Sequence, residues 1–279
     1  MKAIAVALAV LAVSVGGASA DVPVPVFRHV VVIMFENKEQ SSVLGSGNAP
    51  TFDAMAHRYA TLSHYYGVTH PSLPNYLALV SGSTQGINSD CTSCLVSAPD
   101  LADTLERGGK TWKLYAEGLP HPGFIGASYG RYAKKHTPFL YFRDIVTKPK
   151  RRNRVVPLAQ LHADLAGHKL PDFALIVPDL CHSMHDCSVR TGDTWLRSKL
   201  PPLLGLTDSV VFVVFDEGSS SSRGGGHVPA LALGSAVRPG VSFDNITSHY
   251  GLLRTIEDSW NLPLLAHSAE TQPITGIWR

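Results

Sequence analysis

Four groups of polar residues are suited to catalysis or metal binding, and each lies where an apolar run ends or a helix begins. Carboxylates and imidazoles recur in these groups, and together they suit a divalent cation or a bound phosphate. The second group also holds a serine, between prolines that restrict the backbone at the start of a predicted helix. In chain order, the groups are residues 36–38 (ENK), 70–75 (HPSLPN), 179–187 (DLCHSMHDC) and 216–218 (DEG), with 224–229 (GGGHVP) just beyond the last.

Apolar strands that alternate with helices must position these groups. The predicted strands are residues 29–35, 111–117, 172–178, 209–215 and 229–234. The predicted helices are residues 51–59, 72–82, 100–109, 158–167 and 248–260. This alternation indicates the α/β class, and we expect a single three-layer α/β/α sandwich with a mostly parallel central sheet. Ligands of such sheets bind at the carboxyl ends of the strands, where three of the four polar groups lie.

The first residues and the charge balance narrow the location and the partners. Residues 1–20 are typical of a signal peptide, because Lys2 precedes an apolar run too short to span a bilayer and residues 18–20 (ASA) fit a cleavage site. We therefore expect a secreted protein without stable membrane insertion. The 24 basic residues nearly balance the 22 acidic ones, so nothing suggests a nucleic-acid partner, and we expect a monomer.

The four cysteines fall in two close pairs, Cys91 with Cys94 and Cys181 with Cys187. An even number of cysteines in an exported chain favours disulfides. Three connectivities are possible, and we expect local pairing within each pair, which would fix loops beside the polar groups. A zinc site built from all four thiolates is the alternative.

The order of the polar groups resembles the bacterial phosphoesterase family, which includes secreted acid phosphatases and phospholipases C. That family belongs to the alkaline phosphatase superfamily, and its small mycobacterial members act on phosphoinositides. The resemblance covers about residues 29–260 and includes KKHTPFLYF and SHYGLLRTIED. It implies an alkaline phosphatase-like phosphoesterase domain over residues 21–279. The implied substrate is a small-molecule or lipid phosphate ester, and the implied activity is that of a metal-dependent phosphomonoesterase.

The resemblance implies that Ser72 is the nucleophile and forms a phosphoserine intermediate. At the start of a helix, free backbone N–H groups and the positive end of the helix dipole favour a phosphate. Pro74 fits the first turn, where its missing N–H would have no partner within the helix. Alternatively, Ser72 only caps the helix and Asn75 only fills its first turn.

A divalent cation would activate the serine, because a serine hydroxyl is a weak nucleophile near neutral pH. In this sequence a second carboxylate stands where two-zinc members of the superfamily have a histidine. This substitution favours magnesium, calcium or manganese, although zinc is also compatible. The ligands that the resemblance implies are Glu36, Asn37, Ser72, Asp216 and Glu217.

The remaining polar residues are expected to contact the phosphate or to bind a second metal. The catalytic residues that accompany Ser72 are predicted to be His70, His185, Asp186 and His227, and one of the imidazoles would protonate the leaving alcohol. A second metal site is possible at Asp179, His182, His185 and His227. Substrate contacts are predicted for Asn37, Asn75, Lys135, His136 and His182. The basic run at 148–154 is expected to be a solvated loop, and the alternative is that it attracts an anionic lipid headgroup. His249 is expected to be structural.

Three other functions are compatible with the sequence. The first is a phospholipase C-type phosphodiesterase, which would use the same site. The second is a carboxylic-ester hydrolase, because residues 126–130 (GASYG) match the nucleophile-elbow pattern around Ser128. That motif needs a strand before it and a helix after it, and a strand is poorly indicated here. The third is a non-enzymatic metal-binding module, which the retention of Ser72 and the carboxylates argues against.

Overall fold

A central eight-stranded sheet organises the protein, for which a computed structural model describes residues 23–279. The predicted signal peptide at 1–20 lies outside the described residues. The strand order across the sheet is β11-β2-β10-β9-β1-β8-β4-β7, and only β10 runs antiparallel to its neighbours. In that order, the strands are Val241–Phe243, Ala60–Leu62, Ala230–Leu233, Ser209–Phe215, His29–Phe35, Phe173–Val177, Trp112–Ala116 and Val155–Pro157.

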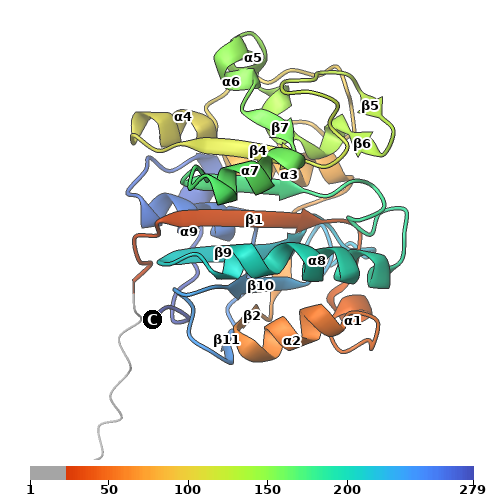
Figure 1. Ribbon diagram of the computed structural model, residues 1–279, viewed down its shortest axis with the longest axis vertical. Helices are drawn as coiled ribbons and strands as arrows, with labels where there is room; N and C mark the ends of the chain where they lie inside the picture. The colour runs from red at the N-terminus through yellow and green to blue at the C-terminus, as the bar shows by residue number, and fades with distance from the viewer. Residues whose placement is uncertain (1–22) are drawn as a thin grey trace, which may run out of the picture.

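Helices cover both faces of the sheet, which confirms the predicted three-layer α/β/α architecture. Figure 1 shows α2, α7 and α8 in front of the sheet and α3 and α9 behind it. The longer helices are α2 (Pro50–Arg58), α3 (Ser72–Ser81), α4 (Leu101–Arg107), α7 (Ala159–Ala166), α8 (Val189–Leu204) and α9 (His249–Ser259). The shorter ones are α1 (Gln40–Val43), α5 (Arg143–Val146) and α6 (Pro149–Arg152). Among residues 23–279, none of these helices has the length and apolarity that a membrane crossing needs.

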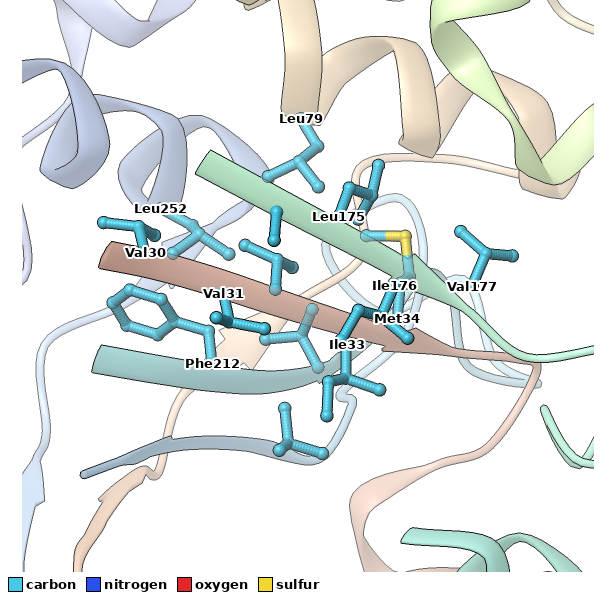
Figure 2. Close-up of a cluster of buried hydrophobic side chains, with 14 of the residues drawn as sticks. Val30, Val31, Ile33, Met34, Leu79, Leu175, Ile176, Val177, Phe212 and Leu252 are labelled. Atoms are coloured by element: carbon cyan, nitrogen blue, oxygen red, sulfur yellow. The ribbon is translucent and has the colours of Figure 1, made fainter. Parts of the chain in front are cut away.

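Burial on both faces explains why the central strands are apolar along their whole length. In β1, every residue from Val30 to Phe35 is fully buried, as expected for a parallel strand between two helical layers. Figure 2 shows side chains of β1, β8 and β9 in one cluster, with Leu79 of α3 and Leu252 of α9 packed against them. This packing makes the sheet and α3 a rigid support for the residues that follow the strands.

The strand register sets which polar residues meet at the carboxyl edge of the sheet. Phe35, the last residue of β1, pairs with Phe215, the last residue of β9. Glu36 and Asp216 therefore leave the sheet side by side. The N–H group of Asp216 also donates to the carbonyl oxygen of Phe35, which joins the two strand ends.

The long connection between β4 and α7 supplies the edge strand β7. It spans residues 118–157 and contains the small hairpin of β5 (Ser128–Tyr129) and β6 (Tyr132–Ala133), together with α5, α6 and β7. Figure 1 shows α5 and α6 beyond β7, and β5 and β6 toward the carboxyl ends of the strands. Two further short strands, β3 (Tyr65–Tyr66) and β12 (Thr247–Ser248), pair with each other outside the main sheet. We refer to residues 118–157 as the excursion.

Candidate active site

Ser72 lies among carboxylates at the carboxyl edge of the sheet. Its Oγ is 3.1 Å from Oε2 of Glu36 and 3.3 Å from Oε1 of Glu217. The side chain of Asp216 is also within reach of the hydroxyl. Three carboxylates from two distant segments therefore surround one serine that is only 1% exposed. The structure thus brings Ser72 together with Glu36 and Glu217, two of the carboxylates expected to share a cation with it.

The start of α3 is fixed by Asn75 rather than by a side-chain cap. Its Oδ1 accepts hydrogen bonds from the N–H groups of Val68 (2.7 Å) and Thr69 (3.2 Å), and its Nδ2 donates to the Thr69 carbonyl oxygen. The residue before the helix, Pro71, is extended and makes no side-chain cap. Asn75, predicted to contact substrate, instead uses its amide to hold the loop that leads into Ser72.

The buried carboxylates resist ionisation. Burial raises the pKa of Glu36 well above its ordinary value, and the adjacent Asp216 raises it further. Burial also raises the pKa of Asp216, although the N–H groups of Asn37 and Glu217 donate to its Oδ1. Burial, together with Asp216, raises the pKa of Glu217 to about 7. Without a cation, these groups would share protons rather than carry three negative charges.

The donor set fits a hard divalent cation. Oδ2 of Asp216 is buried and has no hydrogen-bond partner among residues 23–279, so it can accept a ligand without losing another contact. Lys38 acts electrostatically on Glu36 and Asp216, but its Nζ donates to the Met184 carbonyl oxygen 2.8 Å away. Carboxylate oxygens together with a hydroxyl are the ligands that magnesium, calcium and manganese prefer. These acidic groups could therefore bind a metal.

Asn37 belongs to the same group of oxygen donors. Its backbone lies in the left-handed region, with φ of 54°, which asparagine tolerates better than most residues. This conformation lets its N–H group donate to Asp216 and puts its side-chain nitrogen 3.4 Å from Oε2 of Glu36. The turn after β1 thus brings Asn37 back toward the carboxylates.

A tyrosine and a histidine cover the other oxygen of Glu36. The Tyr76 hydroxyl donates to Oε1 of Glu36, and Nε2 of His136 lies 3.2 Å from the same oxygen. The two rings stack, with their centroids 5.3 Å apart. Burial, followed by the charges of Lys135 and His185, lowers the pKa of His136 well below its ordinary value. His136 is therefore a neutral ring beside Glu36, and its buried Nε2 makes no hydrogen bond within residues 23–279.

His70 also acts on a carboxylate. Its Nδ1 lies 2.6 Å from Oε2 of Glu217, and its Nε2 lies 3.0 Å from the carbonyl oxygen of Ser220. Both ring nitrogens are thus occupied, so His70 joins Glu217 to the 218–226 loop. The predicted role of His70 as a phosphate ligand would require one of these contacts to break.

A second arm of the site is built by His185, Asp186 and Lys135. Nδ1 of His185 lies 2.6 Å from Oδ1 of Asp186, and its Nε2 lies 3.4 Å from Nζ of Lys135. Asp90, which the sequence analysis did not single out, accepts from Lys135 (2.8 Å) and from the N–H group of Leu73 at the start of α3. Asp90 therefore connects this arm to the serine helix and occupies one of the N–H groups predicted to be free.

The four residues of the possible second metal site do not form one group. Asp179 and His182 cluster instead with Glu117, and each contributes an atom to a set whose members all lie within 4.8 Å of one another. His227 lies elsewhere, with its Nε2 2.7 Å from the Ser63 carbonyl oxygen. His185 instead pairs with Asp186, so these four residues have different partners.

The cysteines pair locally. Cys91 is bonded to Cys94 and Cys181 to Cys187, which confirms the predicted connectivity and excludes a zinc site made from four thiolates. The first bridge closes the loop that follows Asp90. The second closes the segment that carries His182, His185 and Asp186.

Ser128 does not occupy a nucleophile elbow. It is exposed and is the first residue of the two-residue strand β5, which continues into a hairpin and not into a helix. The structure therefore gives the carboxylic-ester hydrolase motif neither of the elements that it needs.

Four residues around the site were missed by the sequence analysis, and only some of them could have been found. Glu117 is the last residue of a predicted strand, and Tyr76 lies one helical turn after Ser72, so both had a positional signal. Glu39 accepts from the N–H groups of Ser219, Ser220 and His227 and fixes the 218–227 loop, but no pattern marks it. Asp90 lies in an irregular loop and had no signal.

The fold is that of the alkaline phosphatase superfamily. A protein of that superfamily from Vibrio parahaemolyticus matches with a TM-score of 0.59 at 14% identity, over 88% of this chain and 70% of that chain. The lipoteichoic acid synthase LtaP from Listeria monocytogenes matches with a TM-score of 0.60 at 11% identity, over 88% of this chain and 74% of that one.

Sequence comparison gives the family. The chain belongs to the Phosphoesterase family, which it matches over residues 46–263. It is 34% identical over 260 residues to a phosphatidylinositol-3-phosphatase of Mycobacterium tuberculosis, a match that covers 91% of this chain and 84% of the relative. It is 31% identical over 219 residues to an acid phosphatase of Aspergillus fumigatus, covering 73% of this chain and about half of the relative (49%). These matches confirm the prediction of a phosphoric ester hydrolase.

Proposed function

We propose that the protein is a secreted, metal-dependent phosphatase that hydrolyses phosphate monoesters through a phosphoserine intermediate on Ser72. The observation that carries this proposal is the position of Ser72 Oγ, 3.1 and 3.3 Å from two buried carboxylates at the start of α3. The names of the mycobacterial and fungal relatives support a phosphatase, and the former makes phosphoinositides candidate substrates. The two disulfides support export to an oxidising compartment.

In the first half-reaction, Ser72 attacks phosphorus. Its proton is lost to water, because the two carboxylates nearest to Oγ, Glu36 and Glu217, are proposed to hold a cation, while the bond between phosphorus and the leaving oxygen breaks. A divalent cation held by Glu36, Asp216 and Glu217, with Asn37 beside it, would favour loss of the serine proton and neutralise phosphate charge. The buried packing of α3 would hold the hydroxyl in one position for attack on the phosphate.

His185 is the group best placed to protonate the leaving alcohol. Asp186 orients its imidazole through Nδ1, which leaves Nε2 facing Lys135. The ammonium of Lys135 would bind a phosphate oxygen next to that imidazole. In the second half-reaction the roles reverse: His185 removes a proton from water, water attacks the phosphoserine, and Ser72 regains its proton as phosphate leaves.

The proposal is tested with a soluble monoester and a bis-ester assayed side by side, at acid and alkaline pH, with and without a chelator. We expect turnover of the monoester that is lost with chelator and restored by one added divalent cation. Faster turnover of the bis-ester would instead identify a phospholipase C-type phosphodiesterase. Full activity of the protein after complete removal of metal would overturn the metal-dependent mechanism.

Replacing Asp186, the carboxylate that orients His185, should lower kcat more for some phosphate monoesters than for others. We expect Asp186→Asn to lower kcat about 100-fold for an alkyl phosphate, whose alcohol must be protonated. The effect should be small for p-nitrophenyl phosphate, whose leaving group departs as an anion. If Asp186→Asn lowered kcat by the same factor for both substrates, His185 would not be the general acid. Asp258→Asn, in a half-buried i,i+4 ion pair on α9, is the matched control.

A further inference from the structure

The excursion carries a strong excess of positive charge. Residues 118–157 contain nine of the 24 basic residues of the chain and only one of its 22 acidic residues, Asp144. The remainder of the chain is therefore acidic overall, although the protein is nearly neutral. Figure 1 shows α5, α6, β5 and β6 of the excursion together at one end of the molecule.

Part of this charge is neutralised within the fold. Arg151 is buried and pairs with Asp103, Glu106 and Asp144, so it ties α6 to α4 and α5. Arg154 pairs with Glu106 as well. The prediction that the basic run is a solvated loop therefore does not hold for Arg151, which is structural.

Other cations of the excursion face solvent. Lys148, Lys150 and Arg131 are exposed, and none of them forms an ion pair within residues 23–279. Lys148 and Lys150 flank the start of α6, and Arg131 is in the turn of the β5–β6 hairpin. These three side chains are free to bind anions from outside.

Large apolar side chains are exposed on the same excursion. Ile125 is 50% exposed and Tyr129 is 60% exposed, and the two lie four residues apart. The ring of Phe124 packs edge-to-face against that of Tyr129, with ring centroids 6.2 Å apart. The loop that carries Ile125 lies against the basic run, because the N–H group of Gly123 donates to the Val155 carbonyl oxygen. Exposed apolar and cationic side chains are therefore carried by adjoining segments of the excursion.

The hairpin is held rigidly beside the active site. The N–H group of Leu180 donates to the carbonyl oxygen of Arg131, and Nζ of Lys134 donates to the carbonyl oxygen of Thr92. Both partners belong to segments next to the disulfides. Directly after β6 come Lys135 and His136, which lie at the active site. A surface that contacts the hairpin is therefore close to the entrance for a phosphate ester.

We propose that the excursion docks the protein on an anionic lipid surface, with Ile125 and Tyr129 entering the interfacial layer while Lys148, Lys150 and Arg131 bind lipid head groups. Exposed aliphatic and aromatic side chains next to lysines and arginines are the combination that binds such interfaces. This surface is separate from the hydrolytic residues, so the inference goes beyond the proposed function and does not depend on it.

Vesicle binding by the full-length mature protein tests the docking surface. The probes are vesicles of phosphatidylcholine alone and of phosphatidylcholine with phosphatidylglycerol, measured by cosedimentation at low and high salt. We expect binding only to the vesicles with phosphatidylglycerol and weaker binding as salt rises. The double variant Lys148→Glu/Lys150→Glu should bind about tenfold more weakly or worse, and Ile125→Ser/Tyr129→Ser about fivefold more weakly.

Matched controls carry the same chemical changes elsewhere. Lys169→Glu/Arg197→Glu reverses two exposed cations outside the excursion, and Val26→Ser removes an apolar side chain that is 76% exposed. Both controls should bind the vesicles as wild type does. Equal binding by wild type and the charge-reversal variant, or by wild type and the apolar variant, would overturn the proposal.

An activity measurement separates this inference from the proposed function. All docking variants should turn over a soluble monoester at the wild-type rate, because none of the changed residues contacts the active site. Hydrolysis of a phosphoinositide presented in vesicles with phosphatidylglycerol should fall in parallel with binding. Loss of vesicle binding alongside normal turnover of the soluble monoester supports the docking surface, whereas absence of any turnover by wild type would count against the phosphatase alone.

Discussion

Replacing Ser72 with alanine is expected to lower kcat for a soluble phosphate monoester by about 1,000-fold or more. The Ser72 hydroxyl lies between Glu36 and Glu217, and the methyl group of alanine cannot carry the phosphoryl group between the two half-reactions. Binding of phosphate should change much less than turnover, because Lys135 and the carboxylates remain in place. Steady-state kinetics together with the inhibition constant of inorganic phosphate measures both quantities.

Two companion variants make this result specific. Ser72→Thr keeps a hydroxyl at the start of α3 and should retain part of the activity, whereas Ser128→Ala changes an exposed hairpin residue and should be fully active. Rapid acid quenching of the wild type during turnover should trap phosphate covalently on the peptide that contains Ser72. Wild-type turnover by Ser72→Ala, or phosphate trapped on another residue, would exclude the proposed nucleophile.

The convergence of Glu36 and Asp216 could be predicted because it follows from the strands. Both residues directly follow long apolar runs, and parallel strands end at the same edge of a sheet. The position of Ser72 could be predicted too, since the prolines and asparagine around it mark the start of a helix. These are local patterns that the sequence displays directly, and family resemblance added the roles.

Features that depend on distant contacts could not be predicted in this way. The helix α8 lacks the usual helical signal in its sequence, because it contains Pro201 and Pro202. Packing against α2 helps to hold it in place. The strands β2 and β11 have three residues each, too few for a periodic pattern. Likewise, the grouping of His182 with Glu117, and not with His185, depends on how a disulfide-closed loop folds back on the sheet.

Removing one buried carboxylate should abolish turnover and yet stabilise the metal-free protein. We expect Asp216→Asn to lower kcat by about 100-fold or more, since the amide is a poorer ligand for a divalent cation. In the presence of chelator, the same variant should have a higher Tm than wild type at pH 8. The reason is that Asp216 is fully buried beside Glu36, and removal of an uncompensated buried charge is favourable.

The increase in Tm on adding metal should depend on pH if the carboxylates around Ser72 form a metal site. The pKa of Glu217 is raised to about 7, so in the metal-free folded state it binds a proton that the unfolded chain releases above about pH 4.5. The free energy of unfolding without metal should therefore fall as pH rises from about 4.5 to 7. A bound cation replaces the proton, so the increase in Tm on adding metal should be larger at pH 8 than at pH 5.

Glu257 provides the matched control for this measurement. Burial raises its pKa to about 7 as well, but it lies on α9 and accepts hydrogen bonds from Ser268 and Leu265, away from Ser72. Glu257→Gln should therefore reduce the fall in stability with pH equally with and without metal, whereas Glu217→Gln should reduce it only in the metal-free protein. An equal effect of metal on Tm at pH 5 and pH 8 in wild type would show that the carboxylates around Ser72 do not exchange protons for a cation.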